Sequence, residues 1–527
     1  MWIDALCIDQ EDDTEKSEQI DQMRQIYAGA FSVTTWLGPA ADNSDVAMRW
    51  IQRYGGWAFE LGIGSRSELQ LRHLLEIVDS RGRASVEEKI QTFIEDLKVQ
   101  LSQEGAEQRR RITALDLLFK RPYWSRVWVV QELVSASQAL FVCGTEKVTE
   151  EALHYSLRLL RNFRRYQILK FGQDNSPSEP QRASLISIDT HDPIALLKFR
   201  RAAGLFPLVY LLRSLRTFGA TDPRDKIFAL LGIASDAKAL ALCPDYGKSC
   251  EEVYSEVALT LIRNGHYDLL SLSDSSKRIV GLPSWSPDWS IKNRRKPLQE
   301  RSLDRSTLPL TTILEPTFSA SGIKRTLDLS GRSGVIRSMP LLLYGAVLGT
   351  VGQLGLVWEN RGVGIWLHDL DRLSYLATDT FKTTEGRQKT VWRTAVADQE
   401  IRQGKKKPRL SKEKLSSVHE VLKDKDLSLT KVQTLITTGL RDYCKQLQIV
   451  APGRRPLSMS SGYYGIGPHE TQAGDVLVIF IRAQVPYILR RYSEGNSFRL
   501  VSEAYVHGVM DSEAIKDFIT TEMISLV

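Results

Sequence analysis

The chain has 527 residues, of which 42% are hydrophobic and 25% are charged, and its formal net charge is +7 at pH 7. This length is sufficient for two to four domains with real cores, and the composition agrees with a soluble intracellular protein, which predicts a cytoplasmic location. The five cysteines form no CxxC pair and are odd in number, which argues against both a zinc site and a disulfide framework.

Much of the positive charge lies in short runs, such as residues 109–111, 294–296 and 405–407. No aromatic residues alternate with these runs, as they would on a surface that stacks nucleic-acid bases. Solvated loops explain the runs better, so we expect no nucleic-acid partner.

The chain opens on a run that predicts a buried strand. Residues 2–8 are apolar apart from Asp4, a pattern suited to a sheet that is covered on both faces, and Cys7 is expected to be a small buried member of that strand. Asp4 needs a partner in such a strand, and we expect Arg121 or Arg126 to supply it.

A helix and a second strand follow directly. Apolar residues recur at helical spacing over residues 20–31, and residues 33–37 predict a strand. Strand, helix and strand in such a short stretch form one βαβ crossover, so the two strands are expected to be parallel neighbours. Ligands of parallel sheets lie beyond the carboxyl ends of the strands, where this chain carries Asp9, Gln10 and Gly38.

Composition and periodicity predict three regions: an α/β domain over residues 1–145 with a charged helical insertion at about 65–111, a mainly helical region over 146–300, and a β-rich region over 301–527. A second charged insertion, at about 382–431, interrupts the last region and is expected to form helices. Three short β-branched or aromatic runs between residues 475 and 507 predict an antiparallel meander.

Several motifs stand out in chain order: WIDALCIDQ (2–10), WLG (36–38), RPYWSRVWVVQEL (121–133), TDPRDKIFALLG (221–232), PDY (244–246), LPSWSPDW (282–289) and a tail over 462–508. Together they closely resemble the fungal heterokaryon incompatibility (HET) domain and the proteins that carry it. The residues that define the resemblance structurally are Trp2, Asp4, Trp36, Arg121, Trp124, Arg126 and Trp128. Members of the family usually have a tyrosine-rich strand before the first motif, so the resemblance implies that the first strand of the domain is missing and that Met1 lies inside it.

The resemblance also bears on residues 340–358, which are nearly free of charge and place Gly345 and Gly349 at the spacing of membrane-helix pairs. Further glycines at positions 352 and 355 would weaken a helix. The family implies a strand, a turn and a second strand here, and we expect no membrane partner.

The usual catalytic patterns are absent from the sequence: it has no GxSxG, no P-loop, no HExxH and no Rossmann fingerprint. The glycine-rich segment over residues 462–467 precedes Pro468 and a strand, so it predicts a hairpin turn and not a phosphate-binding loop. No histidine pair has ligand spacing, and no metal site is predicted.

The segment WVVQEL (128–133) is similar to the Trp-Cys-x-x-Glu-Leu segment of TIR domains, which fold as a flavodoxin-like parallel sheet. In the TIR domains that cleave NAD, this glutamate is catalytic. The resemblance therefore implies that Glu132 stabilises the cationic ribosyl centre as nicotinamide leaves, with Asp9 at a ribose hydroxyl and Gln10 and Gly38 in the same nucleotide site.

Other interpretations stay open. Glu132 can instead pair with Arg126 or Arg121 on a helix surface, and TIR-like domains also act as adaptors whose surfaces assemble without chemistry. The tryptophan-rich run over residues 121–132 would suit such an interface. The favoured function is non-self recognition by a heterokaryon incompatibility protein whose HET domain triggers programmed cell death through protein partners or self-association. The alternatives are an NAD-cleaving enzyme and a non-catalytic adaptor.

Overall fold

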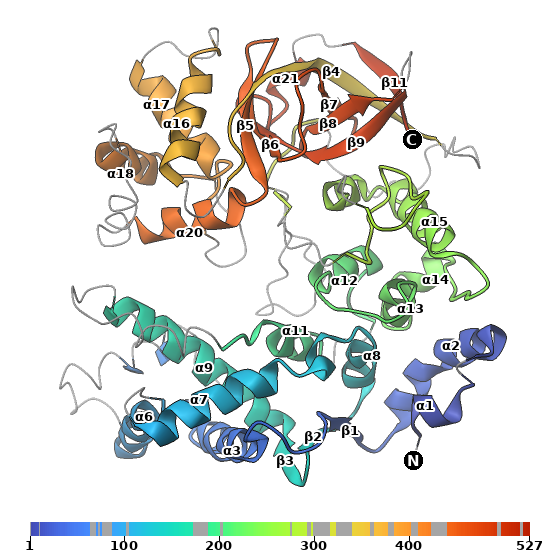
Figure 1. Ribbon diagram of the computed structural model, residues 1–527, viewed down its shortest axis with the longest axis vertical. Helices are drawn as coiled ribbons and strands as arrows, with labels where there is room; N and C mark the ends of the chain where they lie inside the picture. Colours follow the sequence, from blue (N-terminus) through green and yellow to red (C-terminus); the bar gives the residue numbers. More distant parts are fainter. Residues whose placement is uncertain are drawn as a thin grey trace. The chain divides into compact units, whose positions relative to one another are not determined.

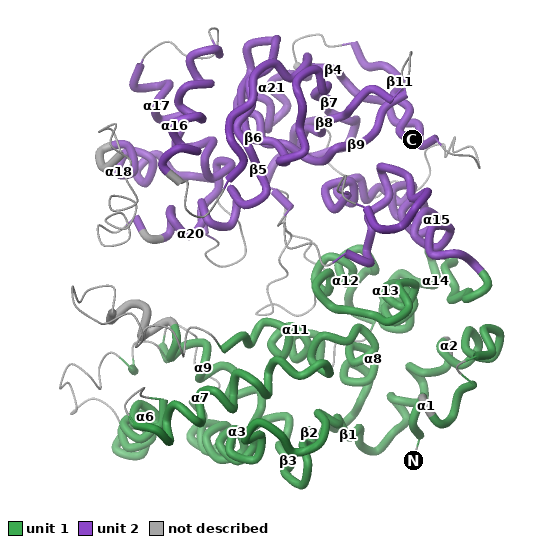
Figure 2. The backbone as a smooth tube through the Cα atoms, viewed as in Figure 1, with its two compact units in different colours: residues 1–247 green, residues 248–527 purple. Residues whose placement is uncertain are grey.

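The computed structural model describes residues 2–9, 11–63, 70–71, 74–75, 87–101, 105–171, 188–200, 204–273, 277–291, 297–298, 317–322, 340–358, 363–377, 384–401, 409–422, 440–492, 497–516 and 520–527. These residues form two compact units, residues 1–247 and residues 248–527, which Figure 2 shows in green and purple. The predicted helical region over 146–300 is thus divided between the units. The architecture is mixed, with a small sheet and many helices in the first unit and a larger sheet in the second (Figure 1).

The sheet of the first unit has three strands, β1 (Val33–Trp36), β2 (Ala139–Cys143) and β3 (Glu146–Thr149), in the order β1-β2-β3. Strands β1 and β2 are parallel, with Val33 opposite Ala139, and β2 and β3 are antiparallel. The predicted strand over residues 33–37 is therefore confirmed, but its parallel neighbour lies about a hundred residues further along the chain.

Helices form most of the first unit. They are α1 (Asp4–Cys7), α2 (Asp13–Gly29), α3 (Ser44–Trp50), the π-helix η1 (Ile51–Gly55), α4 (Gly56–Glu60), α6 (Glu88–Gln100), α7 (Ala106–Phe119), the 3-10 helix η4 (Pro122–Ser125), α8 (Trp128–Ser135), α9 (Glu150–Phe171), α11 (His191–Phe199), α12 (Leu208–Ser214), α13 (Asp225–Leu231) and α14 (Ala237–Leu240). Helix α2 begins where the side chain of Asp12 accepts hydrogen bonds from the amides of Thr14 and Glu15. Helix α6 lies in the predicted insertion and buries one apolar face, formed by Ile90, Phe93, Ile94 and Leu97.

The prediction of a strand over residues 2–8 is wrong, since Asp4–Cys7 forms the short helix α1. The amide of Cys7 donates to the carbonyl of Ile3 at 2.9 Å, and that of Ile8 donates to Asp4 at 3.1 Å. A helical turn satisfies these main-chain groups locally, whereas a strand depends on a neighbour for them. The expectation for Cys7 fails with the strand, because its side chain is exposed.

The sheet of the second unit closes on itself. Its strands are β4 (Leu341–Leu354), β5 (Arg454–Met459), β6 (Tyr464–Pro468), β7 (Val476–Phe480), β8 (Tyr487–Arg491), β9 (Ser497–Glu503), β10 (Tyr505–Val506) and β11 (Thr521–Leu526). The order is β10-β6-β5-β4-β11-β9-β8-β7, and β7 also pairs with β4, which closes the part from β4 to β7 into a ring. The predicted antiparallel meander is confirmed by the pairs β7–β8 and β8–β9.

Strand β4 lies at the junction of the closed ring and the open part of the sheet. Within residues 340–358, Leu341–Leu354 form this one long strand, and not the expected strand, turn and strand. The register shifts between Val347 and Gly349, and Gly349 has a φ of 137° that favours glycine. This irregularity lets the strand leave β7 and continue along β5, where Val351 lies opposite Met459.

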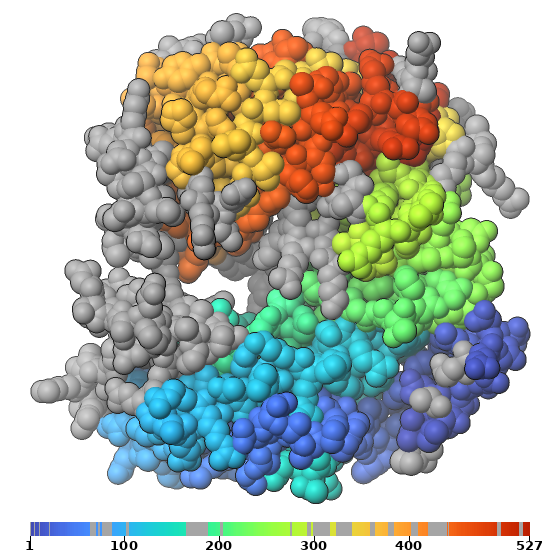
Figure 3. Space-filling view, in the orientation of Figure 1, coloured from blue at the N-terminus to red at the C-terminus, as the bar shows by residue number. Residues whose placement is uncertain are grey.

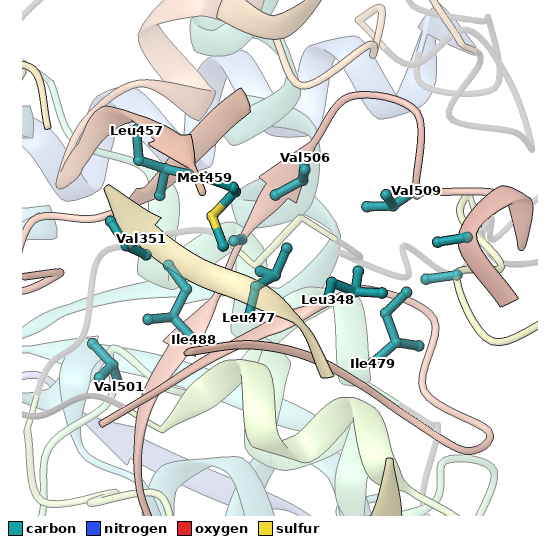
Figure 4. Packing of buried hydrophobic residues seen from close by; sticks show 13 residues of the cluster. Leu348, Val351, Leu457, Met459, Leu477, Ile479, Ile488, Val501, Val506 and Val509 are labelled. Carbon is teal, nitrogen blue, oxygen red and sulfur yellow. The ribbon is translucent and has the colours of Figure 1, made fainter. Parts of the chain in front are cut away.

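The core of the second unit lies between the ring strands. Figure 4 shows Leu348 and Val351 of β4 facing Leu477 of β7 and Ile488 of β8, and Leu457 belongs to the same buried cluster. Alternating side chains of neighbouring strands thus fill the interior of the ring, as in small closed sheets. The hairpin turn predicted over residues 462–467 is only partly confirmed: the turn that joins β5 to β6 lies at residues 460–463, and residues 464–468 form strand β6 itself.

The helices of the second unit are α15 (Cys250–Arg263), the 3-10 helix η5 (Tyr267–Leu272), α16 (Val363–Ser374), α17 (Thr384–Ala395), α18 (Lys412–Leu422), α20 (Arg441–Val450) and α21 (Glu513–Lys516). Helices α17 and α18 lie in the predicted charged insertion, the rest of which is outside the described residues. Helix α17 buries Val391, Trp392 and Ala395. Helix α16 packs against strand β5 and helix α17 against strand β6. The space-filling view shows the yellow-orange segments of this unit next to the orange-red ones (Figure 3). Among the helices described, none has both the length and the apolar character needed to cross a bilayer.

Candidate functional site

Glu132 lies on helix α8, whose entry is fixed by the main chain. The amide of Val127 donates to the carbonyl of Gly219 at 2.9 Å, and the amide of Gly219 donates to Ser125 at 2.6 Å. The next turns bury one apolar face, formed by Val129, Val130, Leu133 and Val134. With that face fixed against the core, the side chain of Glu132 lies on the flank of the helix and is half-buried.

A side-chain network holds the first turn of the same helix. The side chains of Trp128 and Tyr246 both donate hydrogen bonds to the carboxylate of Asp225, at the start of helix α13. Burial raises the pKa of Asp225, and the two hydrogen bonds act in the opposite direction. The ammonium of Lys16 lies 4.1 Å from the centre of the Tyr246 ring, which links the network to helix α2.

The carboxylate of Glu132 has a phenol as its neighbour. The hydroxyl of Tyr123 lies 3.3 Å from Glu132 Oε2 and 3.3 Å from Thr35 Oγ1 of strand β1. Tyr27 of helix α2 and Asp4 of helix α1 complete the group, since the charge of Glu132 raises the pKa of Tyr27 and the charge of Asp4 raises the pKa of Glu132. The site thus joins side chains from two short helical segments, one strand and two longer helices.

Burial is the largest influence on the proton affinity of this carboxyl group. It raises the pKa of Glu132 to about 7, and the negative charge of Asp4 raises it further, whereas the charge of Arg126 and the hydrogen bond from Tyr123 lower it. Burial and the charge of Glu132 also raise the pKa values of Tyr27 and Tyr123. Glu132 therefore changes its charge near neutral pH, which is a property of groups that handle protons or developing charge.

The nucleotide-binding residues expected from the sequence lie in different surroundings. Asp9 is exposed, and its Oδ1 accepts a hydrogen bond from the amide of Glu11 at 2.9 Å. Gln10 lies outside the described residues. Of the described side chains, Asp4, Arg126 and Tyr123 are those whose charge or hydrogen bond shifts the pKa of Glu132.

Gly38 lies in a loop that Arg121 clamps. The guanidinium donates from Nη1 to the carbonyls of Leu37 and Pro39, at 2.8 and 2.9 Å, and from Nη2 to Ala41 at 3.3 Å. Gly38 has a φ of 106°, and a Cβ atom there would lie 3.1 Å from Arg121 Nη1. These contacts give Gly38 and Arg121 a structural role, which is to hold the loop after strand β1. Both terminal nitrogens of the guanidinium thus bind loop carbonyls, and the pairing of Asp4 with Arg121 or Arg126 stays a prediction.

The tryptophans of the motifs have three different environments. Trp124 is 1% exposed, stacks on Phe141 with 5.7 Å between the ring centres, and donates from Nε1 to the carbonyl of Leu118 at 2.8 Å. Trp2 meets the ring of Tyr27 edge-on at 5.4 Å, beside the candidate site. Trp36 is 52% exposed and contributes little to the core.

Sequence reasoning missed the hydroxyl groups of the site. Tyr123 lies in the motif over residues 121–133 and Tyr27 in the helix predicted over residues 20–31, but nothing in their spacing relates either of them to Glu132. Only the packing of helix α2 against helix α8 brings Tyr27 close. No trio of His, Cys, Asp or Glu side chains in the described stretches is placed to hold a metal ion.

Comparison with known proteins gives two matches to family models. Residues 1–132 match the family described as Heterokaryon incompatibility protein (HET), and residues 374–522 match the Het-6 beta-barrel domain. A curated relative, Heterokaryon incompatibility protein 6, OR allele, of Neurospora crassa, is 26% identical over 594 aligned residues, which cover 97% of this chain and 81% of that protein. No solved structure matches the chain, so the resemblance to TIR domains has no structural neighbour.

Proposed function

We propose that the chain acts in non-self recognition, and that residues 1–132, which match the heterokaryon incompatibility (HET) family model, form a HET domain that triggers a cell-death response. The alignment with the Neurospora crassa protein carries this proposal, since it extends over nearly the whole chain and includes both matched domains. In this function the first unit would deliver the response, and the second unit would control it.

The test is a pairing experiment in the fungus that carries the gene. Strains that differ only at this locus are allowed to fuse, and the viability of the fused cells is scored by dye exclusion. We expect death in pairings of unlike alleles, and survival when the gene is deleted from both strains. Equal survival in every pairing of unlike alleles would exclude a role in incompatibility.

We further propose a chemistry for the response, which is cleavage of NAD at Glu132. The supporting observation is a half-buried glutamate whose pKa of about 7 leaves it partly ionised at neutral pH. In a poorly solvated position, the carboxylate would stabilise the positive charge that develops on the ribosyl carbon as its bond to the nicotinamide nitrogen breaks. The bonding electrons leave with nicotinamide, water adds to the ribosyl carbon, and its proton goes to Glu132 or to solvent.

Arg126 fits a role in binding the same substrate. Its side chain is exposed, yet its charge acts on Glu132, so it lies close to the carboxylate without being buried. A guanidinium in this position suits the diphosphate of a dinucleotide, which arginine binds through paired hydrogen bonds.

Purified full-length protein distinguishes catalysis from an adaptor function. We expect the Glu132→Gln variant to lose NAD cleavage by at least a hundredfold, because the amide keeps the shape but cannot carry the charge. The matched control is Glu151→Gln, which alters an exposed glutamate at the start of helix α9. Unchanged turnover in Glu132→Gln would exclude the proposed role. Cell killing without NAD loss in the unaltered protein would favour the adaptor.

A further inference from the structure

The second unit holds a fully buried ion pair whose two side chains also form hydrogen bonds with main-chain groups. Arg454 of strand β5 and Glu503 of strand β9 are joined by a contact of 2.9 Å between Nη2 and Oε1, and their side chains are 1% and 0% exposed. Arg454 also donates from Nη1 to the carbonyl of Val450 at 2.6 Å. Burying two charges costs solvation energy, and further hydrogen bonds to the two side chains are needed to offset that cost.

Glu503 binds the main chain of Leu298. The amide of Leu298 donates to Glu503 Oε1 at 2.7 Å, and the carbonyl of Leu298 accepts from Gln399 Nε2 at 2.7 Å. Gln399 is 0% exposed, and its side-chain oxygen Oε1 accepts a hydrogen bond from Gln446 Nε2 at 3.3 Å. The amide and the carbonyl of Leu298 are therefore both bound by buried side chains of the second unit, and not by the main chain of a helix or a strand.

The leucine itself provides an apolar anchor. Its side chain is 1% exposed, and the preceding Pro297 is also buried. Proline has no amide hydrogen, so it can be buried without leaving a donor unpaired. Recognition of one amide, one carbonyl and one apolar side chain is how protein grooves bind extended peptides. The bond to the Glu503 carboxylate is charge-assisted, which makes it stronger than an ordinary main-chain bond.

We propose that Glu503, Arg454, Gln399 and Gln446 form a peptide-binding socket, and that its occupant is the chain's own segment at Pro297 and Leu298. The socket is one of the points that fix the course of the chain between helix α15 and strand β4, together with main-chain bonds such as that from Ala320 to Gln484. Its chemistry selects a short segment in which proline is followed by leucine. This inference concerns the second unit alone and does not depend on the chemistry proposed for Glu132.

The test empties the socket and refills it from solution. In the full chain, Leu298→Asp places a second negative charge beside Glu503 and should displace the segment. A fluorescent peptide with the sequence of residues 293–303 should then bind this variant at least ten times more tightly than the unaltered chain, whose own segment competes at high effective concentration. Adding Gln399→Ala to the variant should weaken peptide binding at least tenfold, and a peptide with Asp in place of Leu should not bind.

Binding is followed by the fluorescence anisotropy of the peptide. If the peptide binds the unaltered chain and a folded Leu298→Asp variant equally well, the proposal is overturned. If that variant does not fold, hydrogen exchange at the Leu298 amide gives the answer in two other chains. We expect Gln399→Ala to speed this exchange at least tenfold, and Gln353→Ala, whose side chain bonds Arg372 on the surface, to leave it unchanged. Equal exchange in the two variants would also overturn the proposal.

Discussion

The hydroxyl of Tyr123 lies 3.3 Å from Glu132 Oε2 and the same distance from Thr35 Oγ1, so that one phenol connects helix α8 to strand β1. This hydrogen bond favours the ionised form of Glu132, whereas burial and the charge of Asp4 favour the protonated form. The pKa of about 7 is the result of these opposing influences, and several experiments can separate them.

The first prediction concerns stability against pH in the Glu132→Gln variant. Folding raises the pKa of Glu132 from its ordinary value of 4.5 to about 7, so the folded protein binds the proton more tightly than the unfolded chain. The contribution of Glu132 to the stability of the unaltered protein is then fully present below pH 4.5, and it is lost as the pH rises toward 7 and the buried group ionises. Glutamine cannot ionise, so we expect the variant to be more stable by roughly 2–3 kcal/mol at pH 8 and similar at pH 4.5. Urea unfolding at the two pH values measures this, and a constant difference would contradict it.

The second prediction concerns Tyr123→Phe, which removes the hydroxyl that favours the Glu132 carboxylate. We expect the pKa of Glu132 to rise, and the free energy of unfolding to fall by about 1 kcal/mol for the lost hydrogen bonds. A ¹³C NMR titration of labelled glutamate follows the pKa directly. Tyr155→Phe, on helix α9, is the matched control and should leave the Glu132 titration in place.

The third prediction concerns the network that positions helix α8. Tyr246→Phe removes a donor to Asp225, whose buried carboxylate then keeps only the bond from Trp128 of the two side-chain bonds described. We expect unfolding to become easier by roughly 1–3 kcal/mol, and Tyr246→Ala to cost more because the 2%-exposed ring is lost as well. Chemical denaturation measures both variants. Equal stability of Tyr246→Phe and the unaltered protein would show that the network does not hold the helix.

The fourth prediction contrasts two glycines of the first unit. A Cβ atom at Gly55 would lie 1.8 Å from the carbonyl oxygen of Ala152, where helix α9 approaches the π-helix η1, so the backbones would have to separate. We expect Gly55→Ala to cost about 3 kcal/mol or more, in the range of severe overpacking. Gly29, in the last turn of helix α2, has nothing within 4 Å of its Cβ position. Gly29→Ala should therefore be neutral or stabilising by up to about 1 kcal/mol. Thermal unfolding of the two variants and of the unaltered protein measures both effects.

The fifth prediction concerns the buried pair of the second unit. Replacing Arg454 with methionine leaves the Glu503 carboxylate buried without its cation, and we expect a loss of about 3–5 kcal/mol. The pair Lys248–Glu256 is partly exposed, so Lys248→Ala should change stability by less than about 1 kcal/mol. Denaturant titration of the two variants compares them. Similar small losses would mean that water reaches the Arg454 pair.

Features that depend only on residues close together along the chain could be predicted from the sequence. The meander of β7, β8 and β9 follows from short β-branched runs between turns, and helix α6 follows from its apolar period. Glu132 was also identified from its own segment, because a single glutamate follows Trp128 by one helical turn. Each of these patterns is contained within a few residues of the chain.

Features that depend on distant residues could not be predicted. An apolar run such as residues 2–8 fits a buried strand or a helix equally well, and the choice depends on whether a neighbour supplies main-chain partners. The partner of strand β1 lies beyond the helices from α3 to α8, and the ring of the second unit is closed by pairing β7 with β4. The apolar period of a strand states which face is buried but not which strand lies beside it.

The sequence by itself therefore indicated the resemblance to HET-domain proteins, the strand over residues 33–37 and the meander of the second unit, and it singled out Glu132 as a candidate. The tertiary structure decided that Asp4, Tyr27 and Tyr123 surround this glutamate and that its pKa lies near neutral pH. It also decided that Leu298 occupies a socket on the barrel unit. The physical reason is that the loss of solvent and the approach of charges arise only when segments distant in sequence pack together, whereas the spacing of residues along the chain records local periodicity alone.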